Sequence, residues 1–243
     1  MVEEKYTTEQ LVTRWEDRRE IKNLLGKYVV SHLLKKEPAM FESFWSKEQD
    51  ICLGVNEGWF AGADAIRGYY DALDTHTRAV RDLLMQLFPE QVKGKTAEEL
   101  YGIGDFPLRS TTNSVIEIAA DGRTAKGMWH CFGKPVVVDE RGPLSHWLFA
   151  TYCVDFIKED GQWRIWHMMY LEDINAVTGR NWSKNENPYP ELPEFAALKA
   201  VTPPRPNAPA VLRERYTVDR PFTRLPRVPE PYDTFAETFS YGM

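Results

Sequence analysis

Apolar residues near the start of the chain recur at the three- and four-residue spacing of an amphipathic helix. Thr7 and Gln10 form a capping box, in which each side chain satisfies a backbone N–H group of the other at the helix start. The apolar stripe that follows covers residues 21–33, and Tyr28 and His32 lie on it one turn apart. The pattern therefore predicts a long helix whose buried face ends in two side chains that form hydrogen bonds.

Shorter elements follow this helix. Pro38 lies at a first-turn position, where its missing N–H costs nothing, so we expect a second helix from Glu37 to about Trp45. The pattern then predicts two short strands at 51–55 and 58–60 and a helix at 62–73. A helical insertion or lid is expected at 75–106, which continues helically to Leu87 and breaks at Pro89.

The pattern changes to long strands after residue 107. Strands are predicted at 110–119, 124–138, 145–157 and 162–174, with a turn at Gly142-Pro143. The Asp160-Gly161 pair between the last two strands is a strong hairpin signal. Helices first and an antiparallel meander afterwards predict an α+β fold, in which the sheet curls around the helices.

Residues 182–243 differ in composition from the 1–181 domain that precedes them. Eleven of the 16 prolines lie from Pro188 onward, and this density excludes helices and inner strands. The segment is nevertheless richer in aromatic residues than a disordered tail would be, with Trp182, Tyr189, Phe195, Tyr216, Phe222, Tyr232, Phe235, Phe239 and Tyr241. We expect an extended C-terminal arm that docks on its own domain or on a neighbouring subunit.

Composition and charge restrict which kinds of molecule the protein is expected to bind. The net charge is −6 and no dense cluster of Lys and Arg is present, which argues against nucleic acid. No apolar run approaches the roughly 20 residues that span a membrane, and the charged N-terminus lacks a signal-peptide core. The three cysteines show no CxxC spacing, which argues against a disulfide framework or zinc site. We expect a cytoplasmic protein that binds a small molecule.

Three segments carry a family resemblance: EDRREIKNLLGKYV, GWFAGADAIRGYYDAL and YCVDFIKEDGQWRIWH. They resemble the SnoaL-like branch of the nuclear-transport-factor-2 (NTF2) superfamily over roughly residues 8–175. The resemblance implies a cone-shaped fold, with helices packed in a curved antiparallel sheet around a pocket. It does not identify the reaction, because that superfamily includes dehydratases, isomerases, cyclases and non-catalytic subunits.

The first helix and the last hairpin look most like the cofactor-free dehydratases of the group. That resemblance implies acid–base residues on the first helix and the meander, and Tyr28 matches the family tyrosine. The other family positions, an aspartate, a histidine, an aspartate and an arginine, are occupied here by Leu33, Thr112, Gly133 and Glu172. In size and arm the chain is similar to lyases that deformylate lignin-derived diarylpropanes.

Histidines are the candidates for proton transfer. His32 lies on the buried helix stripe, and His130 and His167 lie in the middle of predicted strands. Since histidine exchanges protons near neutral pH, we expect Tyr28, His32 and at least one of the strand histidines to share a catalytic cavity. The alternative is that each is an ordinary core or surface histidine. Without HxH or HExxH spacing, we expect no metal site and no cofactor.

The candidate substrate-binding residues are mostly aromatic or polar residues of the strands: Trp59, Arg109, Thr112, Asn113, Trp129, Trp147 and Tyr170. Alternation along a strand places Trp129 and His130 on opposite faces of the sheet, and the sequence leaves open which one faces the cone. Core packing or surface exposure is the alternative for each of these residues.

The expected activity is that of a cofactor-independent lyase. It would eliminate a hydroxyl group from a bulky hydroxylated aromatic compound, such as a lignin-derived diarylpropane, with deformylation through a quinone methide. The alternatives are a dehydratase or isomerase of a steroid or polyketide, and a non-catalytic partner subunit of an oxygenase. We expect a homo-oligomer, a trimer rather than a dimer, because cone-fold proteins of this group commonly associate through the open face of the sheet.

Overall fold

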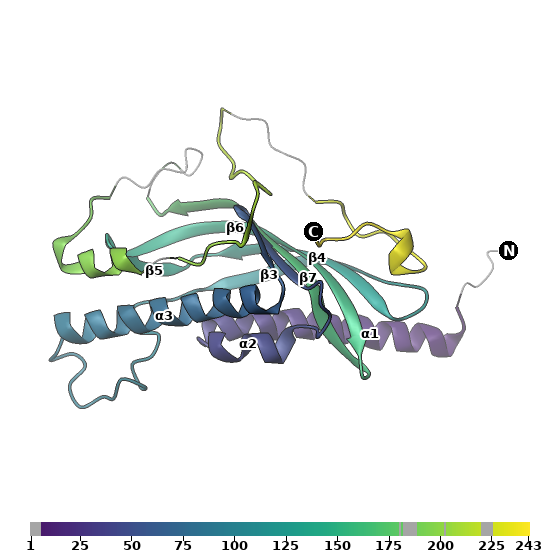
Figure 1. Ribbon diagram of the computed structural model, residues 1–243, viewed down its shortest axis with the longest axis horizontal. Helices are drawn as coiled ribbons and strands as arrows, with labels where there is room; N and C mark the ends of the chain where they lie inside the picture. Colours follow the sequence, from purple (N-terminus) through teal and green to yellow (C-terminus); the bar gives the residue numbers. More distant parts are fainter. Residues whose placement is uncertain (1–5, 180, 182–188, 202, 220–225) are drawn as a thin grey trace.

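The computed structural model describes residues 6–179, 181, 189–201, 203–219 and 226–243. Figure 1 shows the α-helices on one face of a large sheet and the C-terminal segment on the other. The predicted α+β class is confirmed. Trp182 and Phe222, two of the aromatic residues expected in the arm, lie outside the described residues.

The helices are α1 (Thr8–Leu33), α2 (Glu37–Phe44) and α3 (Ala63–Leu87). The predicted capping box begins α1, where the Gln10 amide donates to the Thr7 hydroxyl at 3.2 Å and the Thr7 amide to the Gln10 side chain at 2.8 Å. No helix among the described residues has both the length and the apolar character needed to cross a membrane.

The third helix joins two helical segments that the sequence pattern predicted separately, and it ends at Leu87, just before the predicted break at Pro89. Residues 75–87 continue α3 without a break, because the apolar spacing of Ile66 and Tyr70 is kept by Val80 and Leu84. Val80 and Leu84 pack against Phe195 of a short 3-10 helix, η2 (Pro193–Ala200), in the arm. The helical segment at 75–106 is therefore helical only to Leu87, and turns fill its second half.

The sheet contains all eight strands found in the described residues. These are β1 (Cys52–Val55), β2 (Gly58–Ala61), β3 (Arg109–Ile118), β4 (Thr124–Gly133), β5 (Val136–Asp139), β6 (Gly142–Glu159), β7 (Gln162–Val177) and β8 (Ala208–Pro209). Their order is β3-β4-β6-β7-β1-β2-β8, with β5 paired to β6. The sheet is mixed rather than purely antiparallel, because β1 pairs with β7 in parallel.

The strand predicted at 124–138 is two strands. The chain leaves the β4 ladder at Lys134-Pro135, where proline has no N–H to donate, and re-enters as β5. The turn to β6 lies at residues 140–141, just before the predicted Gly142-Pro143 position. The break places β5 against β6 and leaves β3 as the partner of β4.

Strand register divides the side chains of the sheet between two faces. Trp129, Tyr152 and Tyr170 are cross-strand neighbours that pack in the core beneath the helices. Asp155 and His167 are paired on the opposite, outer face. The inner face carries the core, and the outer face is the one that the arm covers.

The end of the arm, residues 226–243, docks on this outer face (Figure 1). The Tyr241 amide and the Ser240 hydroxyl donate to Asp155 at 2.7 and 3.1 Å, and the Tyr232 hydroxyl lies 3.1 Å from that of Thr124. The described part of the arm thus packs on its own domain. The expected trimer, and a crossing of the arm onto a neighbour, stay predictions.

A buried ion pair anchors this end of the arm. Lys126 is fully buried on the outer face, and its ammonium lies 2.7 Å from Asp155. Arm rings surround the ammonium, with the centroids of Phe235 and Phe239 at 4.5 and 4.6 Å. The second oxygen of Asp155 lies 3.0 Å from Nδ1 of His167. Sheet charges and arm rings therefore form one packed unit.

Loss of the Asp155 charge should destabilise the protein strongly. Asp155→Asn leaves Lys126 buried without a counter-ion and should lower the free energy of unfolding by about 3–5 kcal/mol in urea titrations. Adding Lys126→Met to the Asp155→Asn variant removes the uncompensated charge and should restore part of the lost free energy of unfolding. Equal stability of the single and double variants would contradict the role assigned to the pair.

Candidate functional site

Tyrosine rings and one histidine form a polar cluster between the helices and the inner face of the sheet. The ring centroids of Tyr28 and His32, both on α1, are 5.2 Å apart. Tyr28 lies 6.4 Å from Tyr152 of β6, which lies 4.8 Å from Tyr170 of β7. Helical spacing on α1 and cross-strand pairing on the sheet bring these side chains together. We call this group, with Tyr70 and Arg109 described below, the interior cluster.

A chain of hydrogen bonds polarises two of the tyrosines. The indole N–H of Trp45, which can only donate, donates to the Tyr70 hydroxyl at 2.8 Å, and that hydroxyl lies 3.1 Å from the Tyr28 hydroxyl. The two tyrosines carry two hydroxyl protons, and one hydrogen bond between them uses only one. The second proton is therefore available to a ligand. Burial raises the pKa of both groups, so both stay protonated at neutral pH.

His32 is arranged as a neutral base. Burial lowers its pKa, and its Nδ1 lies 3.4 Å from Oε1 of Glu37, whose hydrogen bond opposes the shift. A carboxylate at Nδ1 favours the tautomer with the proton on that nitrogen, which leaves the lone pair on Nε2. The imidazole beside Tyr28 can therefore accept a proton at neutral pH.

Arg109 brings a positive charge to the same cluster. Its guanidinium carbon lies 5.0 Å from the ring centroid of Tyr170, and its buried Nε has no hydrogen-bond partner. No carboxylate among the described residues lies within ion-pair distance of it. Burial raises the pKa of the Tyr152 and Tyr170 hydroxyls, and the Arg109 charge opposes that rise. A ligand oxygen that becomes negative would find an uncompensated cation here.

Partial exposure in and around the interior cluster is found at its Arg109 end. Arg109, Tyr69 and Glu172 are partly exposed, whereas Tyr28 and Tyr70 are buried.

The structure does not bring the strand histidines to this cluster, and the expectation of a cavity shared with Tyr28 is wrong. His130 is exposed on the outer face of β4, one residue from the inward Trp129. His167 is buried on the outer face, under the arm, where Ser240 and Asp155 contact it. The described residues contain no cluster of three or more metal-binding side chains.

Four predicted substrate-binding residues also lie away from the interior cluster. Trp59 lies against Gly54 on the outer face with Leu212 of the arm. Trp147 is partly exposed next to Phe132, at 5.9 Å between ring centroids. The other two, Thr112 and Asn113, are exposed on β3 at an irregularity in its pairing with β4, where Asn113 has a φ of 53°.

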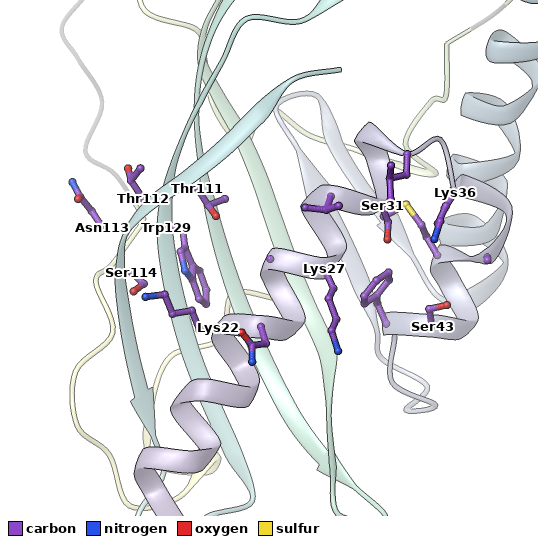
Figure 2. Close-up of a pocket in the computed structure, with 17 residues that line it drawn as sticks. Lys22, Lys27, Ser31, Lys36, Ser43, Thr111, Thr112, Asn113, Ser114 and Trp129 are labelled. Carbon is purple, nitrogen blue, oxygen red and sulfur yellow. The ribbon is translucent and has the colours of Figure 1, made fainter. Parts of the chain in front are cut away.

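A separate groove of about 770 Å³ lies over the solvent side of α1. Figure 2 shows α1 between α2 and β3, with Thr111 pointing from β3 toward the helix. The lining includes Lys22, Gly26 and Val30 of the exposed helix face, together with Thr112, Asn113 and Trp129. Gly26 and Val30 lie on the α1 face turned away from Tyr28, whereas Phe44 and Trp129 at the bottom of the groove pack against Tyr28 and Tyr152. We place the candidate site in the cluster, because the groove has no buried group able to exchange a proton.

Several residues of the interior cluster or next to it were not predicted from the sequence: Tyr70 and Tyr152 in the cluster, and Tyr69, Trp45 and Glu37 beside it. The helical spacing of the sequence does indicate that Tyr70 is buried, since Tyr70 follows the buried Ile66 by one helical turn. The signal for Tyr152 was its place directly opposite Tyr170 in the last long hairpin. Glu37 carried no such signal, because a glutamate at a helix start reads as a surface residue.

Comparison with known proteins places the chain by sequence and by fold. The model of the SnoaL-like domain matches residues 13–169. No curated protein matches the chain.

Solved structures with similar folds have low sequence identity. A protein of unknown function from Mycobacterium tuberculosis is 17% identical, with a TM-score of 0.46 and coverage of 79% of this chain and 89% of that one. An NTF2-like protein with a cystatin-like fold from Novosphingobium aromaticivorans is 17% identical, with a TM-score of 0.43 and coverage of 80% and 96%. A hexachlorocyclohexane dehydrochlorinase is 15% identical, with a TM-score of 0.45 and coverage of 73% and 97%.

The lowered pKa of His32 predicts a loss of stability in acid. The folded protein binds a proton at His32 less readily than the unfolded chain, whose histidines titrate near 6.5. Stability is therefore complete above that pH and falls as the pH decreases below it. His32→Gln should make the pH dependence of the unfolding free energy shallower between roughly pH 5 and 7. His146, whose pKa burial also lowers, should retain part of the slope. An unchanged slope would refute the assignment.

Proposed function

The chain belongs to the SnoaL-like domain family, and from that premise we propose that it is a lyase that eliminates a hydroxyl group from a bulky hydroxylated aromatic compound by acid–base chemistry. One observation carries the proposal: the Arg109 guanidinium lies over the Tyr170 ring with no carboxylate of the described residues within ion-pair distance, in a cluster that also holds a histidine kept neutral by burial. Each of these groups has a role in elimination, and none requires a bound cofactor to act.

The proposed roles follow from the protonation states. Nε2 of His32 accepts the proton that the substrate loses, since burial keeps the imidazole neutral. The spare hydroxyl proton of the Tyr28–Tyr70 pair is donated in a hydrogen bond to the departing oxygen. The Arg109 guanidinium stabilises the phenolate of the substrate in the transition state. Aromatic rings of the cluster hold the substrate ring.

A diarylpropane with hydroxyl groups at both ends of its three-carbon chain is the substrate we propose in detail. The phenolate expels the benzylic hydroxyl, which takes the spare hydroxyl proton of the Tyr28–Tyr70 pair and leaves as water, and a quinone methide forms. His32 then takes the proton of the terminal hydroxyl, the adjacent carbon–carbon bond breaks, and formaldehyde leaves. The electron pair of that bond restores the phenolate. The proton that His32 takes in this step then returns to the tyrosine pair. The products are a stilbene, water and formaldehyde, with no net oxidation or reduction.

A substrate panel tests the function directly. The purified protein is incubated with lignin-type diarylpropane diols, hydroxylated steroids and polyketide analogues, and the products are read by mass spectrometry and a formaldehyde assay. Release of formaldehyde and water from the diol is the expected result. Loss of water alone from a steroid or polyketide would favour the dehydratase alternative. Failure to convert any member would favour a non-catalytic partner subunit.

Matched histidine variants test the site assignment. His32→Gln should lower kcat by about 100-fold or more if His32 transfers the proton. His130→Gln should leave kcat within about twofold, because His130 is exposed on the outer face of the sheet. Chelator treatment should leave activity unchanged, since the proposed steps use only these side chains. A loss of activity in His130→Gln but not in His32→Gln would overturn the assignment.

A further inference from the structure

The C-terminal arm runs along the β2 edge of the sheet and contacts the partly exposed end of the interior cluster. The side-chain oxygen of Asn207 accepts a hydrogen bond from the Ala61 N–H, and its side-chain nitrogen donates one to the Ala61 carbonyl. The Leu212 amide donates to the Asn56 carbonyl at 2.9 Å. The Tyr216 amide then donates to the Asp173 carbonyl of β7 at 2.7 Å. Backbone hydrogen bonds therefore fix the arm beside β2 and the end of β7, next to Glu172.

Arg215 of the arm holds the carboxylate of Glu172. Its Nη2 and Nε lie 2.7 and 3.2 Å from Oε2 of Glu172, and the Asn175 amide donates to the same oxygen at 3.0 Å. Glu172 is on the inner face of β7, where its other oxygen accepts a hydrogen bond from Tyr170 at 3.4 Å. The carboxylate thus has its strongest contacts on the arm side.

Arg109 lies on the other side of the same tyrosine. Its guanidinium is 5.0 Å from the Tyr170 ring, and Glu172 is among the charges that raise its pKa. Arg215 also lies 3.4 Å from the exposed carboxylate of Glu57. This end of the cluster therefore holds two guanidinium groups and two carboxylates, of which Glu172 is the one that contacts Tyr170. Because the Glu172 carboxylate is held by Arg215, its negative charge is offset there, and the Arg109 charge stays available.

We infer that Arg215 is a positioning residue, which offsets the charge of Glu172 so that Arg109 binds an aromatic ligand as its phenolate. The inference rests on the site of the proposed function and gives the C-terminal arm a part in it. It differs from a purely structural role of the arm, since only the affinity for the anionic form of a ligand should depend on Arg215. A neutral ligand of the same shape should not distinguish the variants.

4-Nitrophenol is a suitable probe, because it ionises near neutral pH and its phenolate has its own visible absorbance. The full-length protein should bind the phenolate more tightly than the phenol, which lowers the apparent pKa of the bound probe. 4-Nitroanisole, which cannot ionise, serves as the neutral isostere. Affinities are measured by quenching of tryptophan fluorescence, and circular dichroism checks the fold of each variant.

Arg215→Met should weaken phenolate binding by about tenfold or more and leave 4-nitroanisole binding unchanged. Adding Glu172→Gln to Arg215→Met removes the uncompensated carboxylate and should restore phenolate affinity. Lys199→Met, which removes an exposed arm charge paired with Glu191, is the matched control and should have no effect.

Three results would overturn the inference: no phenolate binding by the unaltered protein, equal phenolate affinity in Arg215→Met, or an equal fall in affinity for both probes. Failure of Glu172→Gln to restore binding in a folded double variant would also overturn it. The binding assay needs no turnover. A protein that binds phenolate in this Arg215-dependent way but converts no substrate would refute the lyase and leave the role of Arg215 standing.

Discussion

A guanidinium inside the cone without a carboxylate partner is the constraint around which the inner face is organised. Removing such a charge from water costs several kcal/mol unless other groups compensate. At Arg109 the compensation comes from the face of the Tyr170 ring and from nearby tyrosines rather than from an ion pair. The arrangement stabilises the cation incompletely, and an anionic ligand would complete it.

Charged side chains have different roles on the two faces of the sheet. On the outer face Lys126 and Asp155 are fully paired and covered by arm rings, so the charges there serve packing. On the inner face Arg109 has no carboxylate within ion-pair distance among the described residues, and His32 is kept neutral by burial. The arm contributes to both, through its last residues on the outer face and through Arg215 at the partly exposed end of the cluster.

Helix periodicity identified part of this site, and strand alternation did not. Tyr28 and His32 were predicted correctly as inward neighbours, since one turn of α1 determines their direction. His167 was misplaced because the arm buries this part of the outer face, so consecutive residues 151–156 of β6 are all buried. Burial on both faces removes the alternation that would indicate which face is inward. The parallel pairing of β1 with β7 joins segments far apart in the chain and left no local signal.

The most direct measurement is a crystal structure with a phenolic ligand bound. We predict that the phenolate oxygen lies within hydrogen-bond distance of the Arg109 guanidinium, with the ligand ring against Tyr170 and directed toward Tyr28. A ligand seated instead in the groove on the solvent side of α1, beside Gly26 and Val30, would contradict it.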